Sequence, residues 1–213
     1  MSTVDADARA LRVRGKTVEV SYNAQAAVDG KNKLLVAIDT INKSDRNALS
    51  AIATEGKENM EVEELTVILD KGFHNGREIQ NCEKASITTI VAVPDVANRH
   101  ENGARPDYLV TKFQYNKEHD TYTCPKGETL TTKGTWHIKS GDKSRGSFKI
   151  YRTPKCKTYP VKHLSTKRKA GREIERSENA EAVEANNERY HSQSELYRKR
   201  QEWNEHIFGT IKR

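Results

Sequence analysis

Two short apolar runs constrain the fold of this chain more than any other feature of its sequence. Leu65–Leu69 (LTVIL) ends at Asp70, and residues 87–93 (ITTIVAV) are stopped by Pro94. Both runs are rich in β-branched residues and are shorter than a buried helix. Such runs are typical of strands that are covered on both faces. Because residues 75–85 between them predict a helix, the sequence favours an α/β sheet.

The residues before these runs predict a hairpin and a further helix. Residues 16–26 alternate apolar and polar side chains, and residues 33–41 are rich in strand formers. An Asp-Gly pair at residues 29–30 is a tight-turn signal, so we expect the two segments to form a β-hairpin. Residues 45–56 predict a helix capped by Ser44. The first hundred residues then have the order β-β-α-β-α-β.

The pattern changes twice after residue 95. Residues 1–95 predict part of a core domain, whereas residues 96–171 break into short strand-like pieces joined by turns. We interpret the second segment as an irregular, β-rich insertion with little core. Residues 172–213 contain no Pro and one Gly, and Glu and Arg dominate them. They therefore predict one long C-terminal helix.

Apolar runs and cysteines exclude two classes of protein. No apolar run approaches membrane-spanning length, and the N-terminal residues lack the pattern of a signal peptide, so we expect a cytoplasmic protein without membrane contact. The three cysteines are an odd number at wide spacing, which argues against a disulfide framework. Cys82 lies on a predicted helix, and we expect it to pack in the core.

Positive charge is concentrated near the C-terminus. The 213 residues hold 37 Lys and Arg against 30 Asp and Glu, a net charge of +7. Residues 141–213 carry 18 basic and 10 acidic side chains, and residues 149–172 hold nine Lys or Arg and no acid. Such a segment attracts a polyanion by releasing counterions, which favours nucleic acid as a partner. A solvated basic loop without a partner explains the same charge equally well.

Two carboxylates stand out by their positions. Asp70 ends a predicted buried strand, and Glu205 lies on the C-terminal helix, opposite the apolar stripe of Leu196 and Trp203. Two facing carboxylates are ligands for Mg²⁺, which takes its other oxygens from water and substrate phosphate. Paired ions would stabilise the attacking and leaving oxygens of a phosphodiester displacement. Spacing alone favours the alternative, a turn Asp and a solvated Glu.

Four segments resemble insertion-sequence DDE transposases, and this resemblance favours the metal-binding role of the two carboxylates. In the order of the family, they are YNAQAAVDGKNKLLVAIDTINKSDRNAL, ELTVILDKGFHNGREIQNCEKASI, DTYTCPKGETL and NEHIFGTIKR. The resemblance covers nearly the whole chain, and the DKGF strand end and the last segment are specific in combination. It implies an RNase H-like catalytic domain with a mixed sheet, interrupted by an insertion before a last helix that returns to the core.

The resemblance also implies a reaction and the residues that perform it. Asp70 and Glu205 would be catalytic and would bind Mg²⁺ or Mn²⁺, so that water and then a DNA 3′-hydroxyl attack phosphodiesters. The partners would be transposon-end and target DNA, in a nucleoid-associated homo-oligomer of the bacterial cytoplasm. Basic side chains of the helix and the insertion would contact DNA: Lys212, Arg213, Arg200, Lys155, Lys157, Lys162, Lys167, Arg168 and Lys169. Lys212 shares the helix face of Glu205, and Arg200 matches the family spacing imperfectly.

The first catalytic Asp of the family has no counterpart here. In the family it lies on a strand upstream of the stretch that corresponds to residues 5–9, and none of Asp5, Asp7, Asp29 and Asp39 matches it. An RNase H-like sheet would then lack its first, central strand and one metal ligand, which leaves strand edges unpaired and weakens metal binding. We therefore interpret the chain as an internal fragment of a transposase and expect little or no catalysis from it.

Two other functions compete with this interpretation. The chain would be a non-catalytic DNA-binding remnant, or an inhibitor of an intact transposase, if its basic segment alone were active. A structure-specific RNase H-like nuclease would need a third carboxylate of its own, for which the sequence offers no candidate.

Cys124 and Cys156 are the remainder of a cysteine pattern. In the resembling stretch of the family, cysteines also occupy the positions of Tyr159 and Ser165. Four such ligands would form a zinc knuckle. Here two remain, with His163 as a third candidate, so we expect free thiols rather than a Zn²⁺ site.

Overall fold

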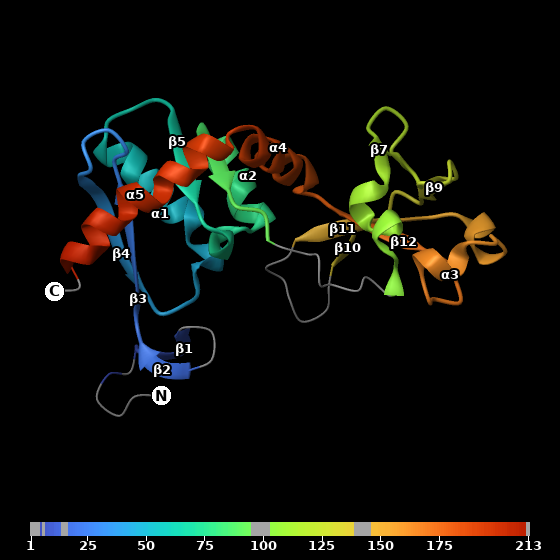
Figure 1. Cartoon of the computed structure of the whole chain (residues 1–213), viewed down its shortest axis with the longest axis horizontal. Helices are drawn as coiled ribbons and strands as arrows, with labels where there is room; N and C mark the ends of the chain where they lie inside the picture. The colour runs from blue at the N-terminus through green and yellow to red at the C-terminus, as the bar shows by residue number, and fades with distance from the viewer. Residues whose placement is uncertain (1–4, 6, 14–16, 95–102, 139–145, 212–213) are drawn as a thin grey trace. The chain divides into compact units, whose positions relative to one another are not determined.

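The chain forms two compact units. The computed structural model describes residues 5, 7–13, 17–94, 103–138 and 146–211. Unit 1 comprises Met1–Pro94 and Glu181–Arg213, and unit 2 comprises Asp95–Ala180. The chain thus leaves unit 1 after its first part, forms unit 2 and returns to unit 1 (Figure 1). Each unit has its own sheets and its own apolar core.

The strands at the centre of unit 1 form two separate two-stranded sheets. β3 (Asn23–Val28) pairs antiparallel with β4 (Leu35–Ile41), and β5 (Leu65–Leu69) pairs parallel with β6 (Ile87–Val91). The helix α2 (Gly76–Lys84) connects the two parallel strands, and the side chain of Asn75 caps it by accepting a hydrogen bond from the backbone N–H of Arg77. These elements give the unit the α/β class that the sequence predicts.

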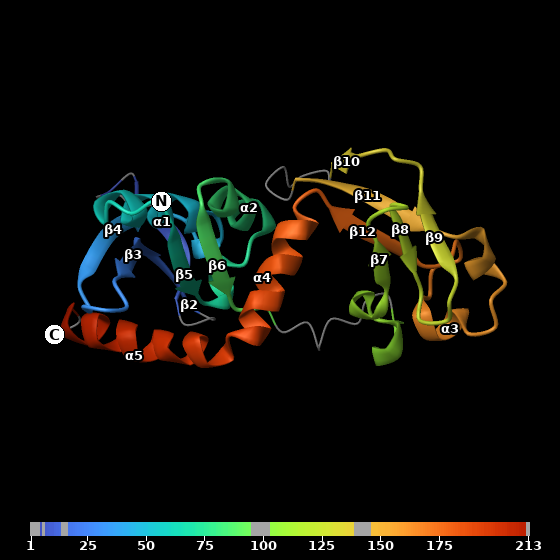
Figure 2. The ribbon, with the colours of Figure 1, turned by 90° about the horizontal axis from the view of Figure 1, so that it is seen from above.

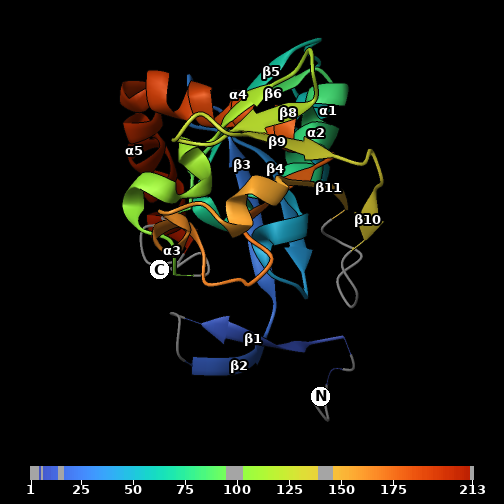
Figure 3. The ribbon, with the colours of Figure 1, turned by 90° about the vertical axis from the view of Figure 1, so that its right-hand side faces the viewer.

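A second hairpin precedes β3. β1 (Arg9–Val13) and β2 (Thr17–Ser21) pair antiparallel (Figure 3). The prediction that residues 16–26 pair as one strand with residues 33–41 is therefore wrong in its first half. The alternation in β2 does indicate a strand, but alternation identifies no partner, and the apolar residue Val18 is 59% exposed.

The helix predicted over residues 45–56 begins later than expected. A short 3-10 helix, η1 (Asp45–Asn47), comes first, and α1 (Leu49–Asn59) follows it. The side chain of Ser44 makes no capping hydrogen bond. Because α1 begins at Leu49, Asp45 lies before it in η1, where its carboxylate is available for contacts outside α1.

One apolar core joins α1, α2, β6 and α4 (Ala180–Ser192). Its buried side chains come from all four elements: Leu49, Ala53, Ile79, Cys82, Ile87, Val91 and Ala182. Cys82 is fully buried, which confirms the sequence prediction. Burial raises the pKa of its thiol to about 12 because an apolar environment disfavours the thiolate.

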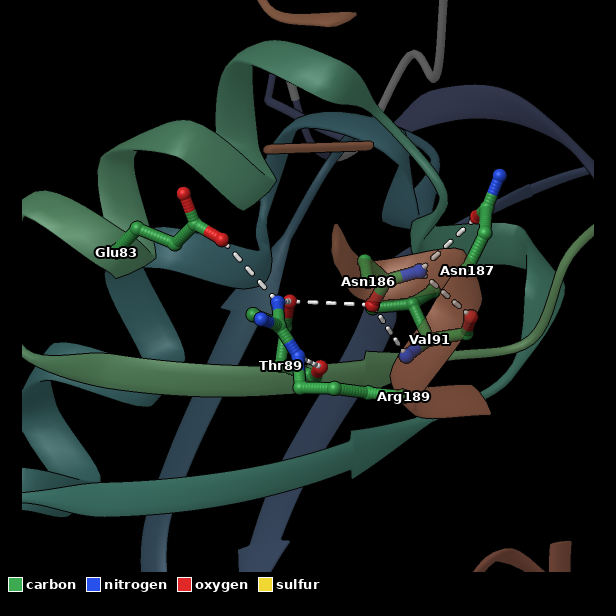
Figure 4. A network of polar contacts seen from close by, with 6 residues as sticks. All are labelled: Glu83, Thr89, Val91, Asn186, Asn187 and Arg189. Atoms are coloured by element: carbon green, nitrogen blue, oxygen red, sulfur yellow. Dashed lines mark hydrogen bonds and ion pairs between the residues drawn. The ribbon is translucent and has the colours of Figure 1, made fainter. Parts of the chain in front are cut away.

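The side chain of Asn186 connects α4 to the end of β6 by hydrogen bonds (Figure 4). Its fully buried Oδ1 accepts hydrogen bonds from the backbone N–H of Val91 at 2.8 Å and from the hydroxyl of Thr89 at 3.1 Å. Its Nδ2 donates to the carbonyl of Val91 at 3.0 Å. Arg189 donates to the carbonyl of Thr89 at 2.9 Å and to Glu83 at 3.2 Å. The side chains of α4 thus bond a strand edge as a neighbouring strand would.

The prediction of one long helix over residues 172–213 is wrong in its first part. β12 (Glu173–Ser177) is a strand, and the helical part is divided into α4 and α5 (Ser194–Ile211) (Figure 2). β12 pairs antiparallel with β11 (Ser147–Arg152) and buries Ile174 and Arg176 on one face. Pairing and burial therefore override the helix propensity of its Glu and Arg residues.

Unit 2 is built on one antiparallel sheet. Its strands are β7 (Gln114–Asn116), β8 (Thr121–Thr123), β9 (Thr129–Thr132), β10 (His137–Ile138), β11 and β12. The order is β10-β11-β9-β8-β7, and β12 pairs with β11. Short helices flank the sheet: η4 (Pro106–Tyr108), η5 (Val110–Lys112), η7 (Pro154–Lys157) and α3 (Lys162–Ser165).

The expectation that the insertion has little core is wrong. Five buried side chains pack together on the sheet of unit 2: Phe113, Tyr122, Leu130, Tyr151 and Ile174. The rings of Tyr122 and Tyr151 meet edge to face with centroids 5.0 Å apart. Because the contributing strands are three to six residues long, no single segment shows an extended apolar pattern.

A hydrogen-bond network centred on the carboxylate of Asp120 lies beside this core. Asp120 accepts hydrogen bonds from the hydroxyls of Tyr115 at 2.8 Å and Tyr151 at 2.5 Å, and it pairs with the Nζ of Lys149 at 2.7 Å. The bonds from Lys149 and Tyr151 lower the pKa of Asp120 to about 2. The same contact with Asp120, after burial, raises the pKa of Tyr151. The ionised form of Asp120 is thus the one that the fold stabilises.

We expect Asp120→Asn to lower the stability of unit 2 in a pH-dependent manner. The folded pKa of Asp120 lies below its ordinary value of 3.8, so its contribution is complete above that value and is lost as the pH falls toward 2. The difference in thermal stability between the wild type and the variant should therefore be complete near about pH 6 and should shrink as the pH falls from about 4 through about 2. A difference that is constant over this range would contradict the assignment.

Candidate functional site

Asp70 lies directly after β5 and begins the short helix η2 (Lys71–Phe73). Its Oδ1 accepts a hydrogen bond from the backbone N–H of Gly72 at 2.7 Å, which holds the half-buried carboxylate at the end of the strand. The turn needs the small residue, because a Cβ on Gly72 would lie 2.9 Å from this oxygen. The DKGF sequence therefore positions a carboxylate where a buried strand ends.

Asp45 is a second carboxylate at the same place. A Cβ on Gly72 would lie 3.2 Å from its Oδ2, so that oxygen and Oδ1 of Asp70 flank one point. The Oδ1 of Asp45 accepts hydrogen bonds from Asn23 Nδ2 at 2.5 Å and Gln25 Nε2 at 3.2 Å. Sequence reasoning missed this residue as part of the site. The only sequence feature that could have indicated Asp45 is the pair Asn23 and Gln25. These residues are two positions apart on one strand, so their amides share a face of β3.

A cavity of about 420 Å³ lies between β3 and β5. Every residue of both strands lines it, and Asp45 and Asp70 lie at the end where β5 finishes. Among the described strands, β3 pairs with β4 alone and β5 pairs with β6 alone. Each of the two strands therefore has one edge without a strand partner in the described part of the chain.

The helix α5 lines the same cavity, close to β3 and β5 (Figure 2). It contributes Arg200, Trp203 and Asn204. Tyr197 lies near enough to Asp70 that this carboxylate, after burial, helps to raise the pKa of the phenol. The guanidinium of Arg200 lies 5.5 Å from the ring of Tyr197, and its buried Nε has no hydrogen-bond partner among the described residues. The structure thus brings Asp70 and Arg200 to one cavity.

Three predicted residues of the C-terminal helix cannot be placed in this way. Glu205 belongs to α5, one residue after Asn204, but its side chain lies outside the described residues. Lys212 and Arg213 lie outside them entirely. The pairing of Asp70 with Glu205 as metal ligands, and the contact of Lys212 with DNA, stay predictions.

Three of the basic residues predicted to contact DNA are engaged within unit 2. Lys155 pairs with Glu128 at 3.0 Å, and Arg168 pairs with Glu173 at 2.6 Å. The Nζ of Lys162 donates to a backbone carbonyl of the following loop at 3.0 Å. Since surface ion pairs are weak, these contacts reduce the availability of the charges without removing it.

The other three basic residues of the insertion are exposed. Within the described ranges, Lys157, Lys167 and Lys169 make no ion pair. The side-chain stem of Lys167 lies against Gly103, because a Cβ there would meet its Cε at 2.8 Å. The ammonium groups of these lysines are therefore available to a polyanion.

Cys124 and Cys156 line one small cavity of unit 2. Tyr159 and Ser165, the other two positions of the cysteine pattern, line the same cavity, whereas His163 does not. The Sγ of Cys124 and that of Cys156 each accept a backbone N–H, at 3.4 and 3.3 Å. His163 instead contacts the carbonyl of Pro160 at 3.2 Å on the surface. Both thiols are free.

Among the described residues, no group of three or more His, Cys, Asp and Glu side chains is arranged to hold a metal ion. No helix in the described part of the chain has the length and apolar character needed to cross a membrane.

Comparison with known families gives one match. Residues 123–213, which run from the end of β8 through α5, match the family model described as "Transposase DDE domain". This match supports the resemblance to DDE transposases over residues 123–213, and Asp70 lies outside the matched residues. No curated protein and no solved structure matches the chain.

Proposed function

The chain is related to DDE transposases through residues 123–213, and from this premise we propose that it carries the DNA-cleaving site of a transposase, built around Asp70. The single observation that supports this assignment is the cavity that Asp70 shares with Arg200. A carboxylate suits a divalent cation, and a guanidinium suits a phosphate. Transposon-end and target DNA would be the substrates, and a nucleoid-associated homo-oligomer would be the working form.

The donor atoms at the end of β5 fit Mg²⁺ or Mn²⁺. One oxygen of Asp70 accepts the N–H of Gly72, and its other oxygen makes no hydrogen bond in the described part of the chain. Hard oxygen donors of this kind suit these ions, and Glu205 of α5 would supply a second carboxylate. When bound, the ion activates water and stabilises the charge that develops on the phosphodiester oxygens.

Side chains of α5 would position the DNA. The buried Nε of Arg200 has no partner among the described residues, and a phosphate oxygen would satisfy it. Arg200 would thereby hold the scissile phosphate beside Asp70, and Asn204, one turn later, lines the same cavity. Lys212, which lies outside the described residues, would contact a neighbouring phosphate.

We also propose that unit 1 is an incomplete RNase H-like sheet. The two strand pairs fit the two sides of such a sheet, and the cavity between β3 and β5 has the position of a first, central strand. A strand placed there would pair with both edges and would end beside Asp45 and Asp70. Unit 2 then corresponds to the insertion predicted over residues 96–171, and α5 to the helix that returns to the core.

A plasmid strand-transfer assay with Mg²⁺ or Mn²⁺ tests this proposal. We expect the chain alone to remain at the background of Asp70→Ala, because the described part of the chain supplies neither the central strand of the proposed sheet nor the metal ligand on that strand. Glu63→Ala, which removes an exposed acid away from the cavity, is the matched control. Robust activity that Asp70→Ala abolishes and Glu63→Ala preserves would support the site at Asp70 and contradict the proposed incompleteness.

A second function, that of a non-catalytic DNA-binding remnant or inhibitor, is favoured by the exposed lysines of unit 2. Lys157, Lys167 and Lys169 need no metal site to bind a polyanion. DNA binding that survives Asp70→Ala and Glu205→Ala, together with inhibition of an intact transposase, would support this second function.

A further inference from the structure

Two carboxylates lie close together at the end of β5. Oδ1 of Asp70 and Oδ2 of Asp45 lie 2.9 and 3.2 Å from the point where a Cβ of Gly72 would be. In the described part of the chain, neither acid makes an ion pair. A cation that lies between two carboxylates is attracted by both of them.

The surrounding residues hold Asp45 in this orientation. Asn23 and Gln25 alternate along β3 and therefore present their amides on one face, where both donate to Oδ1 of Asp45. Oδ2 remains directed toward Gly72. Amide donors that orient a carboxylate in this way are the usual support of a metal ligand.

Gln25 provides an independent observation that points to a ligand at this place. Its side chain is 5% exposed and lines the same cavity as the two acids. Its Nε2 is used by Asp45, but its buried Oε1 has no hydrogen-bond partner among the described residues. A buried carbonyl oxygen without a donor is rare because it loses its hydration without replacement. A cation or its bound water would replace that hydration.

We infer that Asp45 is a cation ligand beside Asp70, and that the two carboxylates and the Oε1 of Gln25 form a binding site for Mg²⁺ or Mn²⁺. Three oxygen donors with the remaining positions filled by water suit these ions. The inference rests on the proposed function, because it adds a residue to the same site. It gives the chain a second carboxylate from its own turn after β4, independent of Glu205.

Binding of Mn²⁺ alone, measured by electron paramagnetic resonance, tests the inference without DNA. We expect Asp45→Asn and Asp70→Asn each to weaken Mn²⁺ binding roughly 10- to 100-fold. Glu63→Gln removes the same charge from an exposed position outside the cavity and should leave the affinity unchanged. Gly72→Ala keeps every charge but places a methyl group against both carboxylates, and it should also weaken binding.

Each outcome separates the inference from the proposed function. If Asp70→Asn weakens Mn²⁺ binding and Asp45→Asn does not, the role of Asp45 is wrong and the site at Asp70 stands. If neither variant changes the affinity, both the inference and the metal role of Asp70 fail. Urea denaturation shows whether each variant is still folded. If Asp45→Asn or Asp70→Asn is unfolded, the Mn²⁺ affinities of Gly72→Ala and Gln25→Leu test the inference instead, and an unchanged affinity in both would contradict it.

Discussion

Asn186→Leu is expected to lower the free energy of unfolding of unit 1 by about 3 kcal/mol. The leucine has a similar size but cannot bond the backbone N–H and carbonyl of Val91 or the hydroxyl of Thr89. The N–H and carbonyl of Val91 would lose these partners while buried, which costs more than the loss of the hydrogen bonds alone. The hydroxyl of Thr89 keeps a contact with Arg189 at 3.4 Å. Urea denaturation followed by far-UV circular dichroism gives the free energy.

Asn187→Leu is the matched control for this prediction. Asn187 is the next residue of α4. Its Oδ1 contacts His74 at 3.3 Å and accepts a hydrogen bond from Nδ2 of Asn186 at 3.4 Å, and both contacts are longer than those of Asn186 with Val91. Its replacement should cost no more than about 1 kcal/mol. Equal losses in the two variants would contradict the role of Asn186 as the residue that fastens α4 to β6. Because α4 leads into α5, this attachment also determines where Arg200 lies.

The combined variant Lys157→Gln, Lys167→Gln and Lys169→Gln is expected to weaken DNA binding strongly. Each phosphate contact that is lost lowers the salt dependence of log K by about 0.9. Loss of three contacts should therefore reduce affinity at about 0.1 M salt by roughly two to three orders of magnitude. Fluorescence anisotropy with a labelled duplex, repeated over a range of salt concentrations, measures the affinity and its salt dependence.

Three exposed lysines of unit 1 provide the control for DNA binding. Replacement of Lys31, Lys43 and Lys84 by Gln changes the net charge equally but leaves unit 2 intact. This variant should retain most of the affinity and most of the salt dependence. A similar loss in both triple variants would show that net charge, and not the basic surface of unit 2, determines binding. An unchanged affinity in the unit 2 variant would remove the basis for a DNA-binding remnant.

The elements that sequence analysis placed correctly have local signals. β5 and β6 are apolar runs with clear ends, and Asp70 could be located because it follows one of them directly. The turn at Gly72 and the cap of α2 at Asn75 also depend on neighbouring residues. Local chemistry therefore sufficed for the part of the site at the end of β5.

The features that sequence analysis missed depend on contacts between distant residues. Asp45 joins the site through Asn23 and Gln25, which lie about twenty positions earlier on another strand. β12 has the composition of a helix, but its pairing with β11 makes it a strand. The core of unit 2 is assembled from single aromatic residues of several short strands. None of these contacts leaves a periodic pattern in the sequence.

Binding of a divalent cation by Asp70 is tested most directly by iron-mediated cleavage of the backbone. Fe²⁺ that replaces Mg²⁺ reduces added hydrogen peroxide to hydroxide and a hydroxyl radical, and ascorbate returns the resulting Fe³⁺ to Fe²⁺. The radicals cut the chain beside the bound ion. We expect cuts next to Asp70 and Asp45 and near Asn23, with loss of all three in Asp70→Asn and suppression by excess Mg²⁺. Cleavage elsewhere, or cuts at these positions that persist in Asp70→Asn, would contradict a metal site at the end of β5.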